Sequence, residues 1–284
     1  MNAFASGPKR NYYGKGDVIV YRLYRDGRPN PVFGANVKLL IYGDAFWQTY
    51  TIGDNTGLVA TDSMKNFIQR ETMNFPGDDL EWYCHFLAAK FLTKYPQAEG
   101  AQVSATQIPW SPVAGSSVAF APGGSVCANA VIEVARAAGE LQIVEARSGI
   151  DGFRLLRLKG SAFTGFVRDE YTTLPDIHDR PLHMWLDLDW TYIDDGVACS
   201  GGAVTRQARG IVESVFAGFE SGSIQEIIYQ IGRKMLAEIP SIAEIRLEAN
   251  NRTWDTIAEQ GLAAGIYTDA RPPYGCLGLT VRRD

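Results

Sequence analysis

The sequence predicts an α+β protein built from two tandem domains. Runs rich in β-branched and aromatic residues alternate with amphipathic stretches, and the order strand, strand, helix, helix, strand occurs twice along the chain. The chain of 284 residues is also long enough to form two domains of ordinary size. We place the boundary after Ala146, so the predicted domains cover residues 1–146 and 147–284.

The first half begins with a predicted antiparallel hairpin. Residues 17–24 are rich in β-branched and aromatic side chains, the turn-forming residues 25–31 interrupt them, and a second β-rich run covers residues 36–42. A further strand at about residues 101–108 closes this unit.

Two helices are expected between these strands. The first runs through about Thr72, and the second is an amphipathic helix that ends near Pro96. The Gly-rich stretches 115–117 and 121–124 predict loops. The apolar face of the second helix recurs at three- and four-residue steps, at Leu80, Tyr83, Cys84, Leu87, Lys90, Phe91 and Tyr95.

The second half repeats this order. Residues 153–159 and 183–190 have β character, helices are expected over about residues 203–219 and from Ser223 onwards, and residues 243–249 form another strand. The helix that begins at Ser223 has one apolar face, formed by Ile224, Ile227, Ile228, Ile231, Met235 and Ile239.

Composition indicates a soluble globular protein and argues against several partners. Hydrophobic residues make up 46% of the chain, as in soluble globular proteins. The net charge is −5 and the Lys and Arg residues are scattered, so we expect no basic surface for binding nucleic acid. No apolar run is long enough to cross a bilayer. Residues 1–10 lack a signal-peptide core, so we expect a short leader on a cytoplasmic protein, and Val281–Asp284 is not a peroxisomal signal.

The cysteines give no sign of a metal site. They are widely spaced without a Cys-x-x-Cys pair, and the only histidine beside one of them is His85. We therefore expect four reduced, mostly buried thiols. These thiols belong to Cys84, Cys127, Cys199 and Cys276.

The most informative stretch is Gly53–Ile68. It starts with a turn rich in Gly, Asn and Asp, continues with a short apolar run and reaches Thr61 or Asp62, which we expect to be the N-cap of a helix. A hydroxyl group and the free N–H groups of a helix start would then face the same place. Such places hold anions or ordered water.

Three motifs resemble the urate oxidases (uricases), in the order in which that family carries them. The segment Val59–Asn66 resembles the family's threonine motif, and Tyr13–Val18 and Gly165–Leu174, followed by Asp179–Arg180, resemble two further family motifs. The resemblance implies oxidation of urate by dioxygen to 5-hydroxyisourate and hydrogen peroxide without a metal or organic cofactor. It also implies two tunnelling-fold (T-fold) domains, whose sheets join into a barrel in a homotetramer with active sites between subunits.

The resemblance assigns proton handling to Lys15 and Thr61. Lys15 stands just before the first strand, where the family has its catalytic lysine, and burial beside another cation would lower its pKa and let the amine accept a proton. Thr61 matches the threonine that relays protons with this lysine and holds water or dioxygen. The neighbouring Asp62 is expected to contribute to substrate binding. A solvated lysine and a plain helix cap are the simpler alternatives.

The same resemblance assigns four substrate-binding residues in the second half. Phe163 matches an aromatic ring that stacks on the substrate, and Arg180 matches an arginine that binds its carbonyl side with two N–H groups. Gln225 matches a glutamine that holds the other edge, and Ile224 aligns with a residue whose backbone contacts the substrate. Ser223–Glu226 has the form of a capping box, which places Gln225 in a first helical turn that favours anions.

The sequence departs from the family pattern at Arg252. The family has an asparagine that binds the dioxygen or water site and a histidine that completes a relay with lysine and threonine. Asn250 matches the asparagine, but Arg252 stands at the histidine. Arginine stays charged and does not shuttle protons, although it can keep Lys15 neutral by repulsion or hold an anionic group. The chain's histidines lie elsewhere, at His85, His178 and His183.

Two alternatives to urate oxidation remain open from the sequence. The same scaffold could oxidise another planar nitrogen heterocycle, such as another oxidised purine or a pterin, because Arg252 replaces the family histidine. The chain could also be a T-fold that has lost catalysis and only binds a ligand. Retained polar side chains argue against this second alternative, namely Lys15, Thr61, Arg180, Gln225 and Asn250.

Overall fold

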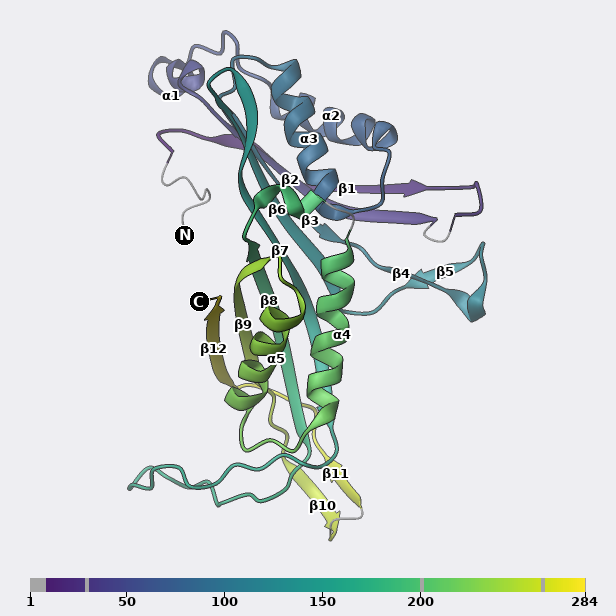
Figure 1. Cartoon of the computed structure of the whole chain (residues 1–284), viewed down its shortest axis with the longest axis vertical. Helices are drawn as coiled ribbons and strands as arrows, with labels where there is room; N and C mark the ends of the chain where they lie inside the picture. Colours follow the sequence, from purple (N-terminus) through teal and green to yellow (C-terminus); the bar gives the residue numbers. More distant parts are fainter. Residues whose placement is uncertain (1–8, 29–30, 200–201, 262–263, 284) are drawn as a thin grey trace. The chain divides into compact units, whose positions relative to one another are not determined.

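The chain forms two compact units (Figure 1). The first contains Met1–Gly149 together with Thr191–Thr205, and the second contains Ile150–Trp190 together with Arg206–Asp284. Residues 1–8 of the expected leader lie outside the described residues. The computed structural model describes residues 9–28, 31–199, 202–261 and 264–283.

The first unit is built on an antiparallel sheet with the strand order β1-β2-β3-β6. β1 (Tyr13–Leu23) and β2 (Val32–Tyr42) form the predicted hairpin, and β3 (Gly100–Gln107) and β6 (Cys127–Ala137) follow. The N-terminal part of β7 (Glu140–Arg157) lies beside β6. Alternate side chains of β2 and β3 are fully buried, namely Val37, Leu39, Ile41, Ala101 and Val103.

Helices cover one face of this sheet (Figure 1). After β2 come the short helices η1 (Asp44–Phe46) and α1 (Trp47–Ile52), and then α2 (Thr61–Asn74) and α3 (Leu80–Lys94). α2 packs against β1, whereas α3 packs against β3 and β6. Most of the predicted apolar face of α3 is buried. Lys90 is exposed instead, and its amine pairs with Glu71 of α2 at 2.5 Å.

The second unit has a similar plan. β7 continues into it, followed by β8 (Leu182–Tyr192), α4 (Ala203–Gly218), α5 (Ile224–Glu238), β9 (Ile242–Asn251) and β12 (Gly275–Arg282). The strand order is β7-β8-β9-β12, and α5 packs against β9 and β12. The predicted apolar face of α5 is confirmed, since it buries Ile224, Ile227, Ile228, Ile231, Met235 and Ile239.

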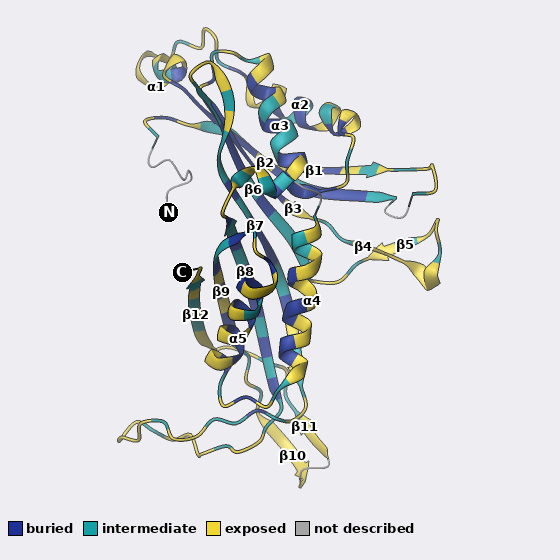
Figure 2. Ribbon diagram, viewed as in Figure 1, coloured by how far each residue is buried: buried dark blue, intermediate teal, exposed yellow. Residues whose placement is uncertain are grey.

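Each unit adds one strand to the order that we predicted. The additional strands are β6 and β12, and a short hairpin precedes each of them. β4 (Trp110–Pro112) pairs with β5 (Phe120–Pro122) in the first unit, and β10 (Thr256–Gln260) pairs with β11 (Ala264–Tyr267) in the second. Figure 2 shows that both hairpins are largely exposed, in contrast to the dark blue interior of the sheet strands.

Two predictions about local features are wrong. The Gly-rich stretches are not simply loops, because η2 (Val113–Gly115) and the end of β5 occupy part of them. The four thiols are free, but Cys84 is buried while Cys276 is exposed and the other two are half-buried. Cys276 is exposed because it lies in β12, at the edge of the sheet.

A pair of buried carboxylates lies at the start of α3. Asp79 caps the helix by accepting a hydrogen bond from the Trp82 N–H at 2.7 Å, while its Oδ2 atom is buried without a hydrogen-bond partner among the described residues. Glu81 is also buried and accepts a bond from the Thr205 hydroxyl at 3.2 Å. Burial, together with the charge of Glu81, raises the pKa of Asp79 to about 7.

Asp79→Asn is expected to remove a pH-dependent loss of stability. The pKa of Asp79 is about 7 in the folded chain, above the ordinary Asp pKa of about 3.9, so its contribution to stability is complete below that ordinary value and falls as the pH rises to about 7. Asparagine is an equally good N-cap without the charge. In urea titrations, the variant should lose less unfolding free energy between pH 5 and pH 8 than the original chain. Asp26→Asn, at an exposed carboxylate, is the control, and an unchanged loss in Asp79→Asn would contradict the expectation.

Candidate active site

Lys15 lies in β1 at an irregularity in the pairing with β2. It pairs with Leu39, but the next paired residue, Val18, lies opposite Val37, so β1 accommodates one extra residue at Gly16–Asp17. In a regular strand, residues 15 and 18 would point to opposite faces. The extra residue places both on the face of the buried Leu39, which is the face that α2 covers.

Glycine next to the lysine allows the two strands to approach. A Cβ atom on Gly14 would lie 1.9 Å from the carbonyl oxygen of Leu39, which real side chains cannot tolerate. A Cβ atom on Gly16 would instead meet the Lys38 side chain at an ordinary 3.5 Å. The sequence Gly-Lys-Gly-Asp is therefore explained by close pairing before Lys15 and by the bulge after it.

Tyr13 connects this strand to the segment that leads into α2. Its hydroxyl accepts a hydrogen bond from the Val59 N–H at 3.0 Å, and its ring packs edge-on against Phe46 with centroids 5.2 Å apart. Burial raises the pKa of Tyr13 to about 12, so the phenol stays protonated. Because Val59 precedes Thr61 by two residues, this bond holds the start of α2 beside β1.

Thr61 is the first residue of α2, and the prediction that Thr61 or Asp62 is the N-cap is wrong. The N-cap is Ala60, which makes no side-chain cap bond, and its carbonyl accepts the first helical bond from the Met64 N–H at 3.2 Å. The extended backbone of Ala60 turns directly into the helix. The Thr61 side chain is consequently exposed at the helix start and is not used as a cap.

Asp62 makes local contacts within α2 instead of capping it. Its carboxylate accepts hydrogen bonds from the Lys65 amine at 2.5 Å and the Asn66 amide at 3.0 Å. The bond to Lys65 is the main cause of the lowered pKa of Asp62, and the charge of Lys15 contributes as well. Lys15, Thr61 and Asp62 are thus gathered in the first unit.

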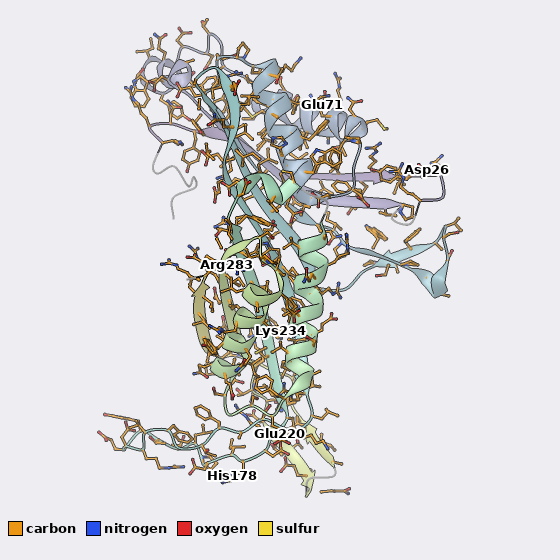
Figure 3. The ribbon with its side chains drawn as sticks, viewed as in Figure 1. Asp26, Glu71, His178, Glu220, Lys234 and Arg283 are labelled. Atoms are coloured by element: carbon orange, nitrogen blue, oxygen red, sulfur yellow. The ribbon has the colours of Figure 1, made fainter. Side chains whose placement is uncertain are left out.

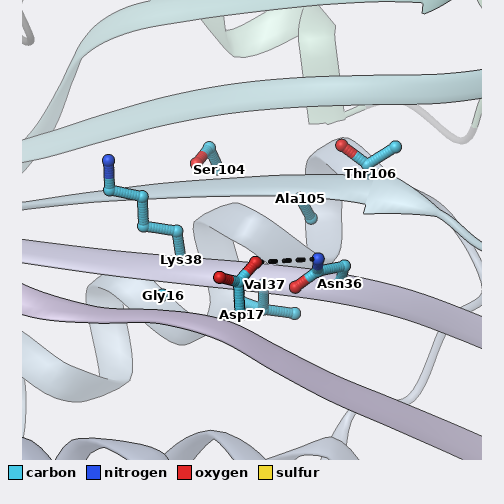
Figure 4. A pocket seen from close by; sticks show the side chains of 8 residues that line it. All are labelled: Gly16, Asp17, Asn36, Val37, Lys38, Ser104, Ala105 and Thr106. Carbon is cyan, nitrogen blue, oxygen red and sulfur yellow. Dashed lines mark hydrogen bonds between the residues drawn. The ribbon is translucent and has the colours of Figure 1, made fainter.

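A pocket of about 370 Å³ opens beside the bulge, on the sheet face opposite to Lys15 (Figure 4). The bulge residues of β1 line it together with side chains of β2 and β3, including Lys38, Ser104 and Thr106. Within it, the Asn36 amide donates a hydrogen bond to the Asp17 carboxylate at 3.3 Å. The sequence motifs did not indicate this polar pocket.

In the second unit, residues 160–163 connect two other segments. On one side they pair with Ser221, just before α5, through backbone hydrogen bonds of 2.8 and 2.9 Å. On the other side, Phe163 exchanges backbone bonds of 2.7 and 3.0 Å with Ile177, and the Arg180 N–H donates to this segment at 3.0 Å. Phe163 and Arg180 are therefore held next to the start of α5.

The side chains of Phe163 and Arg180 are suited to a flat polar ligand. The Phe163 ring stacks on Phe166 with centroids 5.0 Å apart and an angle of 13° between the planes. The Nε atom of Arg180 is buried without a hydrogen-bond partner among the described residues. Burial lowers the pKa of Arg180, but a guanidinium remains charged near neutral pH. The unpaired N–H of a charged guanidinium suits an acceptor on a planar anion.

The start of α5 presents Ile224 and Gln225. The Ser223 hydroxyl accepts a hydrogen bond from the Glu226 N–H at 3.2 Å, which confirms the predicted cap. The capping box itself is displaced by one residue, because the Glu226 carboxylate accepts from the Gly222 N–H at 2.8 Å. Ile224 is buried and anchors the helix, whereas Gln225 is exposed in a turn whose first N–H groups point out of the helix.

Asn250 lies at the C-terminal end of β9, which borders β8 and β12, and Arg252 directly follows this strand. The backbone N–H of Arg252 donates to the His183 carbonyl at 2.9 Å. Its guanidinium carbon lies 3.8 Å from the ring centroid of Trp185 and 3.9 Å from that of Tyr274. The two rings restrict the side chain of Arg252, whose Nε atom is buried without a hydrogen-bond partner among the described residues.

The structure gathers the predicted residues in two groups, one in each unit. Across the described residues, no group of three or more His, Cys, Asp or Glu side chains is placed to hold a metal ion. Of the helices in the described ranges, none combines the length and apolarity that a membrane span requires. The second-unit group comprises Phe163, Arg180, Ile224, Gln225, Asn250 and Arg252.

Several aromatic residues that support these groups were missed by the sequence analysis. Tyr13 lies inside a recognised motif, and Phe166 does too, so their positions carried a signal. Trp185 and Tyr274 are far from Arg252 in the sequence, and no local pattern indicates that they contact it.

Two units of the order strand, strand, helix, helix, strand, strand, each with helices on one face of its sheet, define a tandem T-fold protein. The Uricase family model matches residues 11–126 and 146–276. The chain therefore belongs to the uricase family.

Named relatives agree with this assignment. A uricase from Halalkalicoccus jeotgali is 38% identical, over 85% of this chain and 88% of that protein. The uric acid degradation bifunctional proteins of Bacillus sp. (strain TB-90) and Bacillus subtilis are 36% and 35% identical, over 96% of this chain. The chain spans 60% and 61% of the length of these two relatives.

Solved structures confirm the fold. The crystal structure of urate oxidase from Bacillus sp. TB-90 matches with a TM-score of 0.88 at 35% identity, over 96% of this chain and 100% of that chain. The crystal structure of a uricase from Bacillus fastidious matches with a TM-score of 0.89 at 34% identity, over 97% of this chain and 94% of that chain.

Gly14→Ala is expected to push β1 away from β2 next to Lys15. The substitution should lower the free energy of unfolding by about 3 kcal/mol, as severe overpacking does, because its Cβ meets backbone that cannot move aside. Gly16→Ala is the matched control and should cost less than about 1 kcal/mol, since its Cβ makes ordinary contacts. Urea unfolding of both variants checks this, and equal losses would contradict the argument.

Proposed function

We propose that this chain oxidises urate with dioxygen and releases 5-hydroxyisourate and hydrogen peroxide, without a metal or organic cofactor. The match to the uricase family over residues 11–126 and 146–276 carries the proposal. The polar side chains at the family positions support it, because they suit the binding and deprotonation of a flat anion.

Lys15 and Thr61 handle the first proton in this proposal. They accept the proton that the urate monoanion loses from a ring nitrogen, and the electron-rich dianion then gives two electrons to dioxygen. The same pair returns the proton to the reduced dioxygen, which becomes hydroperoxide. Asp62, which follows Thr61 in α2, contributes to substrate binding. The bulge after Lys15 and the bond between Tyr13 and Val59 support this role, because both restrict the geometry.

Substrate binding is assigned to the second unit. The Arg180 guanidinium donates to the carbonyl side of the ring, and Phe163 stacks on its face. The Gln225 amide and the backbone of Ile224 hold the opposite edge. Asn250 holds water or dioxygen above the ring. The unpaired, buried Nε atom of Arg180 supports this assignment, because it lacks an acceptor that a ligand would supply.

We also propose a cytoplasmic homotetramer with active sites between subunits. Lys15 and Thr61 of one chain would meet Phe163, Arg180 and Gln225 of a neighbour. The edge strands support this assembly, because β1 ends the strand order on one side and exposes large apolar side chains. These are Ile19, Tyr21 and Leu23, which are 53%, 51% and 60% exposed.

Purified protein mixed with urate in air is expected to consume urate and to form peroxide. The urate absorbance and a peroxide assay measure the two changes. Arg180→Gln should lower kcat/KM by about tenfold to a hundredfold, because it removes a charged hydrogen-bond donor. Arg168→Gln is the matched control, since Arg168 lies in the same loop but pairs with Asp176 at 3.1 Å. A folded protein without turnover would exclude urate, and no peroxide with any flat heterocycle would leave only a ligand-binding role.

A second candidate is a relative of urate, such as another oxidised purine or a pterin. The contacts of Arg252 with Trp185 and Tyr274 favour it, because they hold a positive charge where the family has histidine. That charge would suit an additional anionic group on the substrate.

Arg252→His distinguishes this candidate. If the arginine adapts the site to a relative of urate, the variant should raise kcat/KM for urate above that of the original chain. Arg246→His, at an exposed arginine of β9 that pairs with Glu244, is the control. A variant that gains no urate activity counts against the second candidate.

A further inference from the structure

His183 is a titratable side chain beside Arg252 for which the reaction described above has no role. Its carbonyl oxygen accepts the Arg252 N–H at 2.9 Å, and it follows Arg180 by three residues at the start of β8. The imidazole therefore lies in the part of the second unit that holds Arg252. We propose that His183 transfers the second proton of the oxidation, in a chain whose family histidine is replaced by Arg252; this inference rests on the proposed urate oxidation.

The alternation of β8 places His183 on the same face as Trp185. Leu182 and Met184 are 2% and 0% exposed in the core, so the side chains between and after them point to the other face of the sheet. Trp185 contacts the Arg252 guanidinium on that face, at 3.8 Å. His183 and Arg252 thus share one side of the sheet as well as a backbone hydrogen bond.

Aromatic stacking fixes the orientation of the imidazole. The His183 ring stacks on Trp254 with centroids 5.5 Å apart and an interplanar angle of 30°, and Trp254 stacks in turn on Tyr267 at 5.1 Å. The Nδ1 atom of His183 is buried without a hydrogen-bond partner among the described residues. Because Nδ1 is enclosed, Nε2 is the nitrogen that can exchange a proton with a ligand.

Burial favours the neutral form of His183. Burial is the main cause of its lowered pKa, and the guanidinium groups of Arg252 and Arg154 lower it further, whereas Asp269 acts in the opposite direction. Arg154 comes from β7 and lies 4.7 Å from the Trp185 ring. A neutral imidazole near neutral pH is a proton acceptor, so burial, with a smaller effect from Arg252, keeps His183 able to act as a base.

The other histidines are less suitable. His85 lies on α3 of the first unit, whereas Arg252 belongs to the second unit. His178 is exposed in the long loop between β7 and β8 (Figure 3). Neither has a contact with Arg252 among the interactions of the described residues.

His183 carries one proton from water to hydroperoxide in this proposal. After Lys15 and Thr61 have moved the ring proton to reduced dioxygen, the site holds two-electron-oxidised urate and a hydroperoxide anion. A water oxygen bonds to C5 of the ring while neutral His183 accepts the proton that this water loses. The imidazolium then gives the proton to hydroperoxide, which leaves as hydrogen peroxide, and the 5-hydroxyisourate anion is released. The electrons come from urate and go to dioxygen, and His183 ends neutral.

His183→Asn and His183→Phe test this role in the full-length protein. Both should lower kcat for urate by about a hundredfold, within the range of general acid–base catalysis, while KM changes by less than about twofold. The phenylalanine variant keeps a ring against Trp254, so a loss of activity in it reflects lost proton transfer and not lost packing. Added imidazole should restore part of the activity of His183→Asn. His178→Asn is the matched control and should keep full activity.

The pH profile supplies a second readout. On the acid side, kcat/KM should fall as His183 becomes protonated, below the ordinary imidazole pKa of about 6.5. Asp269→Asn removes a charge that raises this pKa and should move the acid limb to lower pH, while Asp255→Asn, whose carboxylate pairs with Arg271, should leave it in place.

Urate turnover that is unchanged in both His183 variants, with the same acid limb, would overturn the inference alone. A folded original chain that does not turn over urate would overturn the proposed function and this inference together.

Discussion

The interrupted pairing of β1 with β2 is the constraint on which the candidate active site depends. Without the extra residue at Gly16–Asp17, the strand period of two would point Lys15 and Val18 to opposite faces of the sheet. One of the two side chains would then point away from α2. With it, Val18 enters the core while Lys15 faces α2. The close contact at Gly14 and the bond from Val59 to Tyr13 hold the same region. A small departure from regular pairing thus positions the lysine without weakening the core.

The second unit shows a different physical feature, a concentration of buried hydrogen-bond donors without acceptors. The Nε atoms of Arg180 and Arg252 and the Nε1 atom of Trp185 are all buried and unpaired within the described chain. Each such group costs about 1–3 kcal/mol when it stays unsatisfied, so natural proteins keep few of them. Those of Arg252 and Trp185 lie on the side of β8 that carries His183, and natural proteins give up stability in this way at functional sites.

The two units share one plan but carry different chemistry. Both have helices on one face of a sheet, with a short hairpin inserted before the last strand. The first unit presents an amine and a hydroxyl from β1 and α2, which are suited to proton transfer. The second presents guanidinium, amide and aromatic groups from the start of α5 and the ends of β8 and β9, which are suited to a flat anion. Two units of one plan can carry different groups in this way, because the alternation that builds the core does not fix the residues at strand ends and helix starts.

The sequence by itself determined the hairpin of β1 and β2, the buried face of α5, the cap at Ser223 and the motifs of the uricase family, because each is written in neighbouring residues. It did not reveal β6, whose alanines and asparagine have weak β propensity and whose pairing with β3 makes it a strand. Nor did it show that Ala60 precedes α2 as the cap. Only the tertiary structure placed Trp185 and Tyr274 against Arg252 and brought His183 beside it, since strand order decides which distant residues become neighbours.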